Sequence, residues 1–264
     1  MCLRIVGPRL KAGVTKKVQM LPILLGVLGL ILGSFIATLV LRWPAGRSVG
    51  GRSACDACGR VLAPWELVPL ASAAVLRGRC RTCRAPIVGL HSWVELAALA
   101  IGAAAGVVAP WPEALAGAAF GWLLLTLALL DGRHWWLPDP ITALLAAGGI
   151  ATGLLGLGPP LLDRAIGGLA GFGALWLIAT AYRRLRGREG MGGGDPKLFG
   201  GIGVWLGWQL LPAVLLVASL LGLGVVLFRT LTGRAMARTD ALPLGVLLAA
   251  AAYPAWLIMV ASQP

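Results

Sequence analysis

Charged residues are scarce in this sequence, and acidic residues are the scarcest. Only 12% of the 264 residues are charged, with 10 Asp and Glu against 23 Lys and Arg. Soluble domains average roughly 25% charged residues, so the composition excludes an ordinary water-soluble domain. The positive excess does not predict nucleic-acid binding, because the Lys and Arg residues lie in short segments between apolar runs, where the positive-inside rule places them.

Two familiar sets of hydrolase residues are also missing. The only histidines are His91 and His134, and the sequence contains neither His-Glu-x-x-His nor Gly-x-Ser-x-Gly. A zinc protease or a serine hydrolase of those types is therefore excluded. No internal repeat is visible, which disfavours a transporter built from inverted repeats.

Long apolar runs dominate what is present. Hydrophobic residues make up 58% of the chain, and runs of about 20 residues can each cross a hydrocarbon core of roughly 30 Å as a helix. We predict an all-α fold, a polytopic transmembrane helix bundle with about eight spans in contact with membrane lipid. The predicted spans are Leu21–Leu41, Trp93–Val108, Ala114–Leu130, Ile141–Leu157, Ala165–Tyr182, Leu198–Leu211, Ala213–Phe228 and Leu242–Val260.

One basic loop orients these spans. Its cations are Arg42, Arg47, Arg52, Arg60, Arg77, Arg79, Arg81 and Arg84, against only Asp56 and Glu66. The positive-inside rule places this loop in the cytoplasm. Residues 110–113 and 158–164 then fall outside and are nearly free of cations, whereas residues 183–197 and 229–240 fall inside and are rich in Arg.

Two segments fit this topology less well. The stretch 198–228 is short for two membrane crossings. The segment 1–19 is rich in Lys and Arg, yet it lies on the opposite side of the first span from the basic loop. We interpret residues 1–20 as an N-terminal extension ahead of a start at Met20, with a cleaved signal peptide as the alternative. Residues 21–110 form an N-terminal domain that includes the loop 42–92, and residues 111–264 form a second membrane domain.

The chain has five cysteines, and four of them form two Cys-x-x-Cys pairs. The first pair is Cys55 and Cys58, and the second is Cys80 and Cys83. Each Cys-x-x-Cys turn, or knuckle, can supply two thiolates, and the spacing of the two pairs is typical of a closed tetrahedral zinc site. We predict a small cytoplasmic zinc-binding loop domain with these four ligands. Two disulfides or a redox role are the alternative, which a reducing cytoplasm disfavours. Because protein would fill all four positions, the zinc would be structural and would not activate water.

Three aspartates are expected at the cytoplasmic membrane face, where carboxylates are costly and usually functional. Asp131 and Asp139 bound the link between the third and fourth spans, and Asp195 follows three glycines at the start of the sixth. Solvated interfacial positions are the alternative for the first two. For Asp195 the alternative is an N-cap outside the α region, with Pro196 at the first helical position. Two close carboxylates can share a proton and act as general base and general acid in peptide hydrolysis.

The same residues resemble the type IV prepilin peptidases, which are membrane aspartic proteases. The resemblance covers the chain from about Leu30 to Pro212 and is carried by several motifs in order. These are Gly33-Ser34-Phe35, the paired Cys-x-x-Cys with Trp65-Glu66-Leu67-Val68-Pro69 between them, Arg77-Gly78-Arg79-Cys80, Val94-Glu95-Leu96, Asp131 with Leu137-Pro138-Asp139, and Gly187 to Asp195 ending in Gly-x-Gly-Asp.

The resemblance implies that Asp131 and Asp195 are catalytic and that Asp139 supports them. It implies a multi-pass protein of the bacterial inner membrane that removes the basic leader from type IV prepilins or type II secretion pseudopilins on the cytoplasmic side. It also implies N-methylation of the new terminus with S-adenosylmethionine, since the cysteine loop accompanies the bifunctional form. An ion-handling transporter and a non-enzymatic assembly protein of the same fold are the alternatives. Gly193 and Pro196 depart from the family pattern at the turn that carries Asp195.

Overall fold

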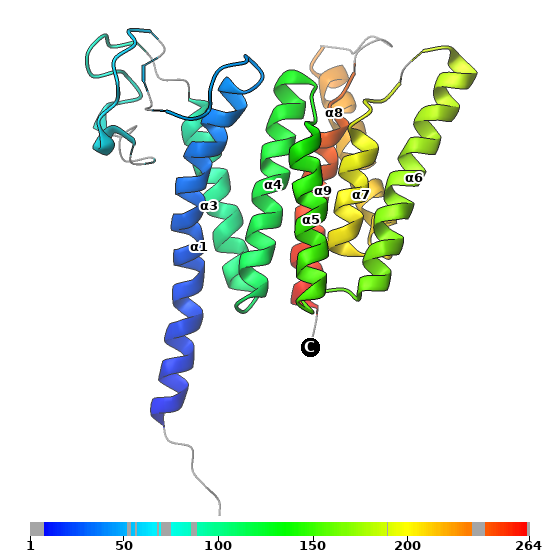
Figure 1. The fold of residues 1–264 in the computed structure, drawn as a ribbon, viewed down its shortest axis with the longest axis horizontal. Helices are drawn as coiled ribbons and strands as arrows, with labels where there is room; N and C mark the ends of the chain where they lie inside the picture. Colours follow the sequence, from blue (N-terminus) through cyan, green and yellow to red (C-terminus); the bar gives the residue numbers. More distant parts are fainter. Residues whose placement is uncertain are drawn as a thin grey trace, which may run out of the picture. The chain divides into compact units, whose positions relative to one another are not determined.

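The structure is a computed structural model, and the residues it describes are helical or in loops. It describes residues 8–51, 54–55, 57–67, 69, 75–85, 89–188, 190–233 and 241–262. Within these ranges there are eight α-helices and one 3-10 turn, and no strand (Figure 1). They are α1 (Pro8–Arg42), η1 (Pro64–Leu67), α3 (Leu90–Val108), α4 (Glu113–His134), α5 (Asp139–Leu154), α6 (Leu161–Arg186), α7 (Asp195–Leu206), α8 (Leu211–Leu231) and α9 (Leu244–Ala261).

The helices confirm a multi-pass, all-α membrane protein. Each of the eight predicted spans overlaps one α-helix of the described residues, in the same order, with boundaries that differ by up to about five residues, except that α1 begins earlier, at Pro8. Six are long and apolar enough to cross a membrane: Met20–Arg42, Leu90–Val108, Glu113–His134, Leu161–Arg186, Leu211–Leu231 and Leu244–Ala261. The other two, α5 and α7, have 16 and 12 residues, and at 1.5 Å per residue they are shorter than the hydrocarbon core.

The chain divides into two compact units, residues 1–118 and 119–264. In the first unit, α1 packs along α3. A Cβ on Gly33 would lie 2.7 Å from the Cα of Glu95, so glycine allows the two backbones to touch, as in many membrane helix pairs. The expectation about the N-terminal extension falls partly outside the described residues, which begin at Pro8.

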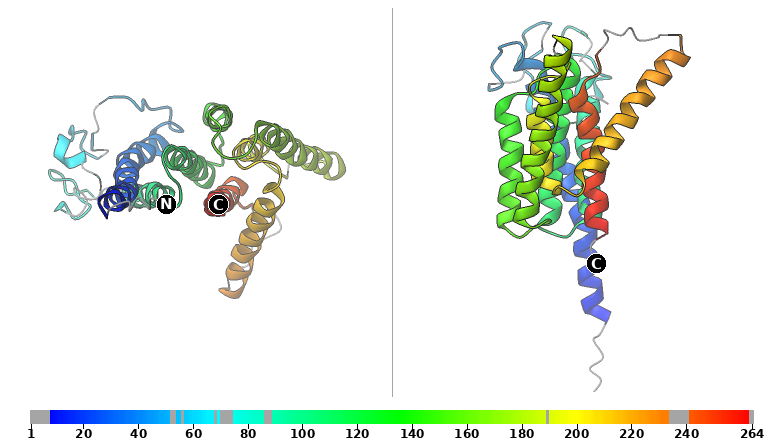
Figure 2. Two further views of the ribbon diagram at one scale, coloured as in Figure 1. Left: turned by 90° about the horizontal axis from the view of Figure 1, so that it is seen from below. Right: turned by 90° about the vertical axis from the view of Figure 1, so that its right-hand side faces the viewer.

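In the second unit, α7 is the central helix and packs against α5, α6, α8 and α9 (Figures 1 and 2). Trp205 near its end stacks on Phe120 of α4 with ring centroids 4.8 Å apart. The Trp205 indole N–H donates a hydrogen bond of 2.7 Å to the Leu145 carbonyl of α5. Figure 2 shows that α8 slopes away from α9 toward Leu231. The short α7 is thus held by its neighbours on most sides.

A buried arginine ties three helices together at the end of α7 that is distant from Asp195. Arg164 of α6 is only 3% exposed. Its guanidinium donates to the carbonyl oxygens of Gly149 in α5 at 2.7 Å and Val204 in α7 at 3.0 Å. Further acceptors are the Pro159 and Leu157 carbonyls and the Thr152 hydroxyl. A cation here also matches the negative ends of α5 and α7.

Candidate functional site

Asp131 lies within the last turn of α4 and not in the following loop. It is 6% exposed, and the backbone N–H of Val246 in α9 donates a hydrogen bond of 3.2 Å to its Oδ2. A Cβ on Gly245 would lie 2.8 Å from the same oxygen. The first turn of α9 therefore rests directly on the carboxylate, where its positive end stabilises a negative charge.

Asp195 is the first residue of α7 and is also 6% exposed. The N-cap is Gly194, so the alternative interpretation of Asp195 as an N-cap outside the α region is wrong. The Asp195 side chain turns back instead, and its Oδ2 accepts a hydrogen bond of 3.1 Å from the Gly192 N–H. Its Oδ1 is buried and has no hydrogen-bond partner among the described residues. That oxygen is available for a proton, a water or a substrate group.

The glycine segment before Asp195 allows a close contact between two loops. A Cβ on Gly194 would lie 2.6 Å from the Cβ of Leu137, whereas one on Gly193 would meet nothing within 4 Å. Gly194 is therefore needed for close approach between the loop after α4 and the loop before α7. The departure from the family pattern at Gly193 lies where the structure leaves space for a larger side chain.

The charges of Asp131 and Asp195 act on each other. Asp195 precedes the apolar part of α7, which is not among the six long spans. Burial first, and then the charge of Asp131, raise the pKa of Asp195 to about 6. Two carboxyl groups in this state can hold one proton between them near neutral pH. Two residues far apart in the sequence thus influence each other's charge, which is what a general acid and a general base acting together require.

Asp139 lies at the same end of the second unit but does not join this pair. It is the first residue of α5, its side chain is 71% exposed, and it forms an ion pair of 2.6 Å with Lys197. Lys197 follows Asp195 by two residues, so it projects from nearly the opposite side of α7. An exposed ion pair of this kind contributes little to stability.

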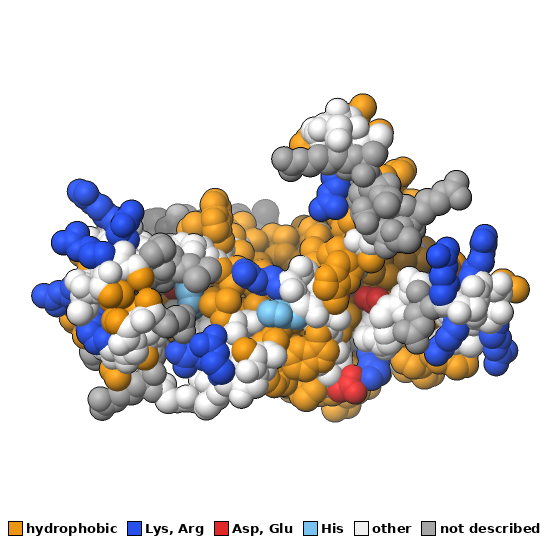
Figure 3. Space-filling model, turned by 90° about the horizontal axis from the view of Figure 1, so that it is seen from above, with side chains coloured by type: hydrophobic (Ala, Val, Ile, Leu, Met, Phe, Trp, Pro, Cys, Tyr) orange, Lys and Arg blue, Asp and Glu red, His pale blue; other side chains and the backbone are white. Residues whose placement is uncertain are grey.

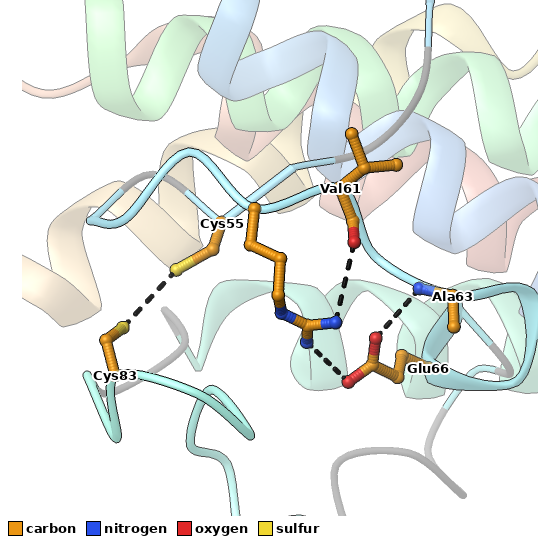
Figure 4. A network of polar contacts seen from close by, with 6 residues as sticks. Cys55, Val61, Ala63, Glu66 and Cys83 are labelled. Carbon is orange, nitrogen blue, oxygen red and sulfur yellow. Dashed lines mark hydrogen bonds and ion pairs between the residues drawn. The ribbon is translucent and has the colours of Figure 1, made fainter.

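The four paired cysteines come together in the first unit. Their sulfur atoms all lie within 4.8 Å of one another, and Cys55 Sγ is 3.8 Å from Cys83 Sγ (Figure 4). Tetrahedral thiolates bound to zinc at about 2.3 Å are separated by about 3.8 Å, so this spacing fits a zinc ion.

The two knuckles have the same backbone pattern. Cys55 N–H donates to the Arg60 carbonyl and Gly59 N–H to the Cys55 carbonyl, both at 2.9 Å. In the second knuckle, Cys80 N–H donates to the Ala85 carbonyl at 2.9 Å and Arg84 N–H to the Cys80 carbonyl at 3.0 Å. The fifth residue of each knuckle is left-handed, with φ of 70° at Gly59 and 60° at Arg84.

The thiols also have the electrostatics of a metal site. The backbone N–H groups of Cys83 and Thr82 are the main causes that lower the pKa of Cys80 to about 6. For Cys83, the Ala85 amide lowers the pKa, but burial and the other three thiols outweigh it and raise the pKa to about 11. Four sulfurs this close cannot all be thiolates without a cation, and a divalent metal removes that conflict.

Comparisons with known proteins agree with this arrangement. Residues 118–227 match the model of the type IV leader peptidase family, and residues 27–109 match the bacterial peptidase A24 N-terminal domain. The chain belongs to the type IV leader peptidase family. The first match contains Asp131 and Asp195, and the second contains the four paired cysteines.

Several curated members of this family are similar over most of the chain. A prepilin leader peptidase/N-methyltransferase of Burkholderia pseudomallei (strain K96243) is 40% identical over 253 residues, which cover 85% of this chain and 81% of the relative. Proteins of the same name from Aeromonas hydrophila and Pseudomonas aeruginosa are 43% and 35% identical, over 67% and 77% of this chain and 63% and 79% of the relatives. No solved structure matched the chain. These relatives do not favour the alternative of an ion transporter.

Proposed function

We propose that this protein is a membrane aspartic endopeptidase that removes the basic leader from type IV prepilins or type II pseudopilins. The observation that carries the proposal is the buried pair of Asp131 and Asp195, which comes from two helices and shares an electrostatic interaction. The relatives named prepilin leader peptidase/N-methyltransferase support the substrate class and a second step, N-methylation of the new terminus.

The two aspartates divide the chemistry of hydrolysis. We assign the general base to Asp131, whose Oδ2 accepts the Val246 N–H at the positive end of α9, and it takes a proton from the attacking water. Asp195, whose pKa is raised to about 6, carries the shared proton and passes it to the leaving amine. The peptide C–N bond breaks as the water oxygen bonds to the carbonyl carbon. Neither a nucleophilic side chain nor a metal takes part.

The site faces the cytoplasm of a bacterial inner membrane in this proposal. In the second unit, the last turn of α4 carries Arg133 and the last turn of α6 carries Arg183, Arg184 and Arg186, and the α6 side chains belong to the group of blue Lys and Arg side chains at the right of Figure 3. Such an excess of cations is typical of the cytoplasmic ends of membrane helices. We also propose the domain division 1–20, 21–110 and 111–264, with the second of these holding the loop and the third holding the peptidase.

We assign Cys55, Cys58, Cys80 and Cys83 as ligands of one structural zinc ion. The thiolates would fill its tetrahedron, so the ion stabilises the loop and leaves hydrolysis to the aspartates. For methylation, S-adenosylmethionine supplies the methyl group, as the family resemblance implies.

One assay with purified full-length protein and a prepilin tests these assignments. Mass spectrometry of the product reports leader removal and methylation together. Asp131→Asn and Asp195→Asn are each expected to reduce cleavage by at least 10³-fold, whereas the matched control Asp139→Asn retains at least a tenth of the rate. Wild-type cleavage by either of the first two variants, with the protein inserted normally, contradicts the catalytic assignment. A cleaved but unmethylated wild-type product contradicts only the methylation step.

A further inference from the structure

The cysteine loop holds an ion pair that the knuckle pattern does not require. Arg60 Nη2 lies 2.7 Å from Glu66 Oε1, and the Ala63 N–H donates a hydrogen bond of 2.8 Å to Glu66 Oε2 (Figure 4). The Glu66 side chain is only 1% exposed, and that of Arg60 is 31% exposed. Arg60 first, and then the Ala63 amide, hold the pKa of Glu66 below its ordinary value. Glu66 is therefore an ionised anchor for the guanidinium.

Arg60 connects the two knuckles. Its carbonyl closes the first knuckle by accepting the Cys55 N–H. Its guanidinium interacts electrostatically with the Cys80 side chain of the second knuckle, and Cys80 is 2% exposed. The Nε of Arg60 is buried and has no hydrogen-bond partner among the described residues. The guanidinium thus acts on Cys80, which is the most buried of the four cysteines, and its Nε–H remains a donor without a partner in the described part of the chain.

We propose that Arg60, oriented by Glu66, is a positioning residue of the metal site that holds Cys80 against the first knuckle and offsets the charge of the thiolates. This inference rests on the proposed zinc ion. Four thiolates around a divalent zinc leave an excess of two negative charges, which is costly at a buried sulfur unless a cation or N–H donors face it. Glu66 uses one oxygen for Arg60 and the other for Ala63, which fixes the carboxylate. The guanidinium is oriented by its bond from Nη2 to Glu66 and by a longer one, 3.5 Å, from Nη1 to the Val61 carbonyl.

A second interpretation is that the ion pair only holds the turn from residue 60 to residue 66. Optical spectra of the protein with Co²⁺ in place of zinc separate the two roles. A cation next to a thiolate stabilises the sulfur lone pairs, so the sulfur-to-cobalt charge-transfer band moves to longer wavelength when the cation is lost. A turn that merely loosens changes the amount of bound metal but leaves the band of the bound fraction in place.

The experiment uses purified full-length protein in detergent, with zinc affinity measured by competition against a chelator and spectra taken after cobalt exchange. Arg60→Met is expected to weaken zinc binding by about 10- to 100-fold, the range typical of residues that support metal ligands, and to shift the band to longer wavelength. Arg60→Lys is expected to restore both in part, because an ammonium keeps the charge but not the fork. Arg79→Met is the matched control: it removes an exposed cation next to Cys80 in sequence, and should change neither.

The outcomes separate this inference from the proposed metal site. A wild-type protein that binds neither zinc nor cobalt overturns the metal site itself. If the wild type binds the metal, and Arg60→Met has the same affinity and the same band, only the role of Arg60 is overturned. If Arg60→Met does not fold, the Arg60→Lys spectrum decides: a band at longer wavelength than that of the wild type supports the inference, and a band identical to that of the wild type contradicts it.

Discussion

Gly245 of α9 lies directly against the carboxylate of Asp131 in α4. A Cβ on Gly245 would be 2.8 Å from Oδ2 and 3.0 Å from Cγ of Asp131, closer than such atoms approach without a shift. The next residue, Val246, donates its backbone N–H to the same oxygen. The position of one proposed catalytic group is thus determined by a helix more than a hundred residues later in the chain.

Gly245→Ala is expected to slow prepilin cleavage by about 100-fold, because a displacement of about 1 Å of a reacting group can have that effect. The added methyl has to push the Asp131 carboxylate or the start of α9 aside. Cleavage rates of the purified protein measure this. Gly224→Ala in α8, where a Cβ would meet nothing within 4 Å, is the matched control and should cleave at the wild-type rate. Equal rates in both variants would mean that α9 does not position Asp131.

The raised pKa of Asp195 predicts how stability changes with pH. Its ordinary value is 3.8 and its value in the fold is about 6, so between these pH values the native state holds a proton that the unfolded state has released. The unfolding free energy therefore falls as pH rises from about 4 through 6. The difference between these two pKa values corresponds to roughly 3 kcal/mol at most.

Thermal unfolding in detergent, measured from pH 4 to pH 8, checks this expectation. Asp195→Asn removes the titrating group, so its melting temperature should fall less over this range than that of the wild type. Asp139→Asn removes an exposed carboxylate instead and should retain the wild-type slope. A wild-type slope in Asp195→Asn would show that another group carries the pH dependence.

Some parts of the site could be predicted from sequence because they depend on local spacing or on loop charge. The Cys-x-x-Cys turns determine where four sulfurs point, and cation-rich loops determine which helix ends share a membrane face. The contact of Val246 with Asp131 and the burial of Arg164 could not be predicted, because they depend on how distant helices pack. One feature of the sequence did set Arg164 apart, because it is the single cation in the segment 158–164, which was predicted to lie outside. The alternative of Asp195 as an N-cap was wrong because Gly194, already in the αR region, takes the N-cap position, and the Asp195 side chain accepts the Gly192 N–H.

Arg84 adopts a backbone conformation that glycine occupies in the matching knuckle. Its φ is 60°, and the equivalent Gly59 has φ of 70°. A residue with a Cβ is strained there by about 1–2 kcal/mol, and glycine relieves this strain. Glycine also gives the unfolded chain more conformational freedom, which offsets part of the gain in stability. Arg84→Gly is therefore expected to stabilise the loop by about 0.5–1 kcal/mol, seen as slower limited proteolysis within residues 42–92. Gly59→Ala should accelerate the same cleavage, and a slower rate in that variant would contradict the argument.

Arg164 is expected to be essential for stability although it lies at the end of α7 that is distant from Asp195. Arg164→Met leaves the carbonyl groups of Gly149 and Val204 without the donor that now joins α5, α6 and α7. Loss of several buried hydrogen bonds to a charged group should cost about 2–4 kcal/mol and lower the melting temperature in detergent. Arg164→Lys should recover little, because an ammonium has three donors where the guanidinium has five. Arg186→Met, which removes an exposed cation from the other end of the same helix, is the control. A melting temperature that falls equally in Arg164→Met and Arg186→Met would mean that the buried network does not hold α7 in place.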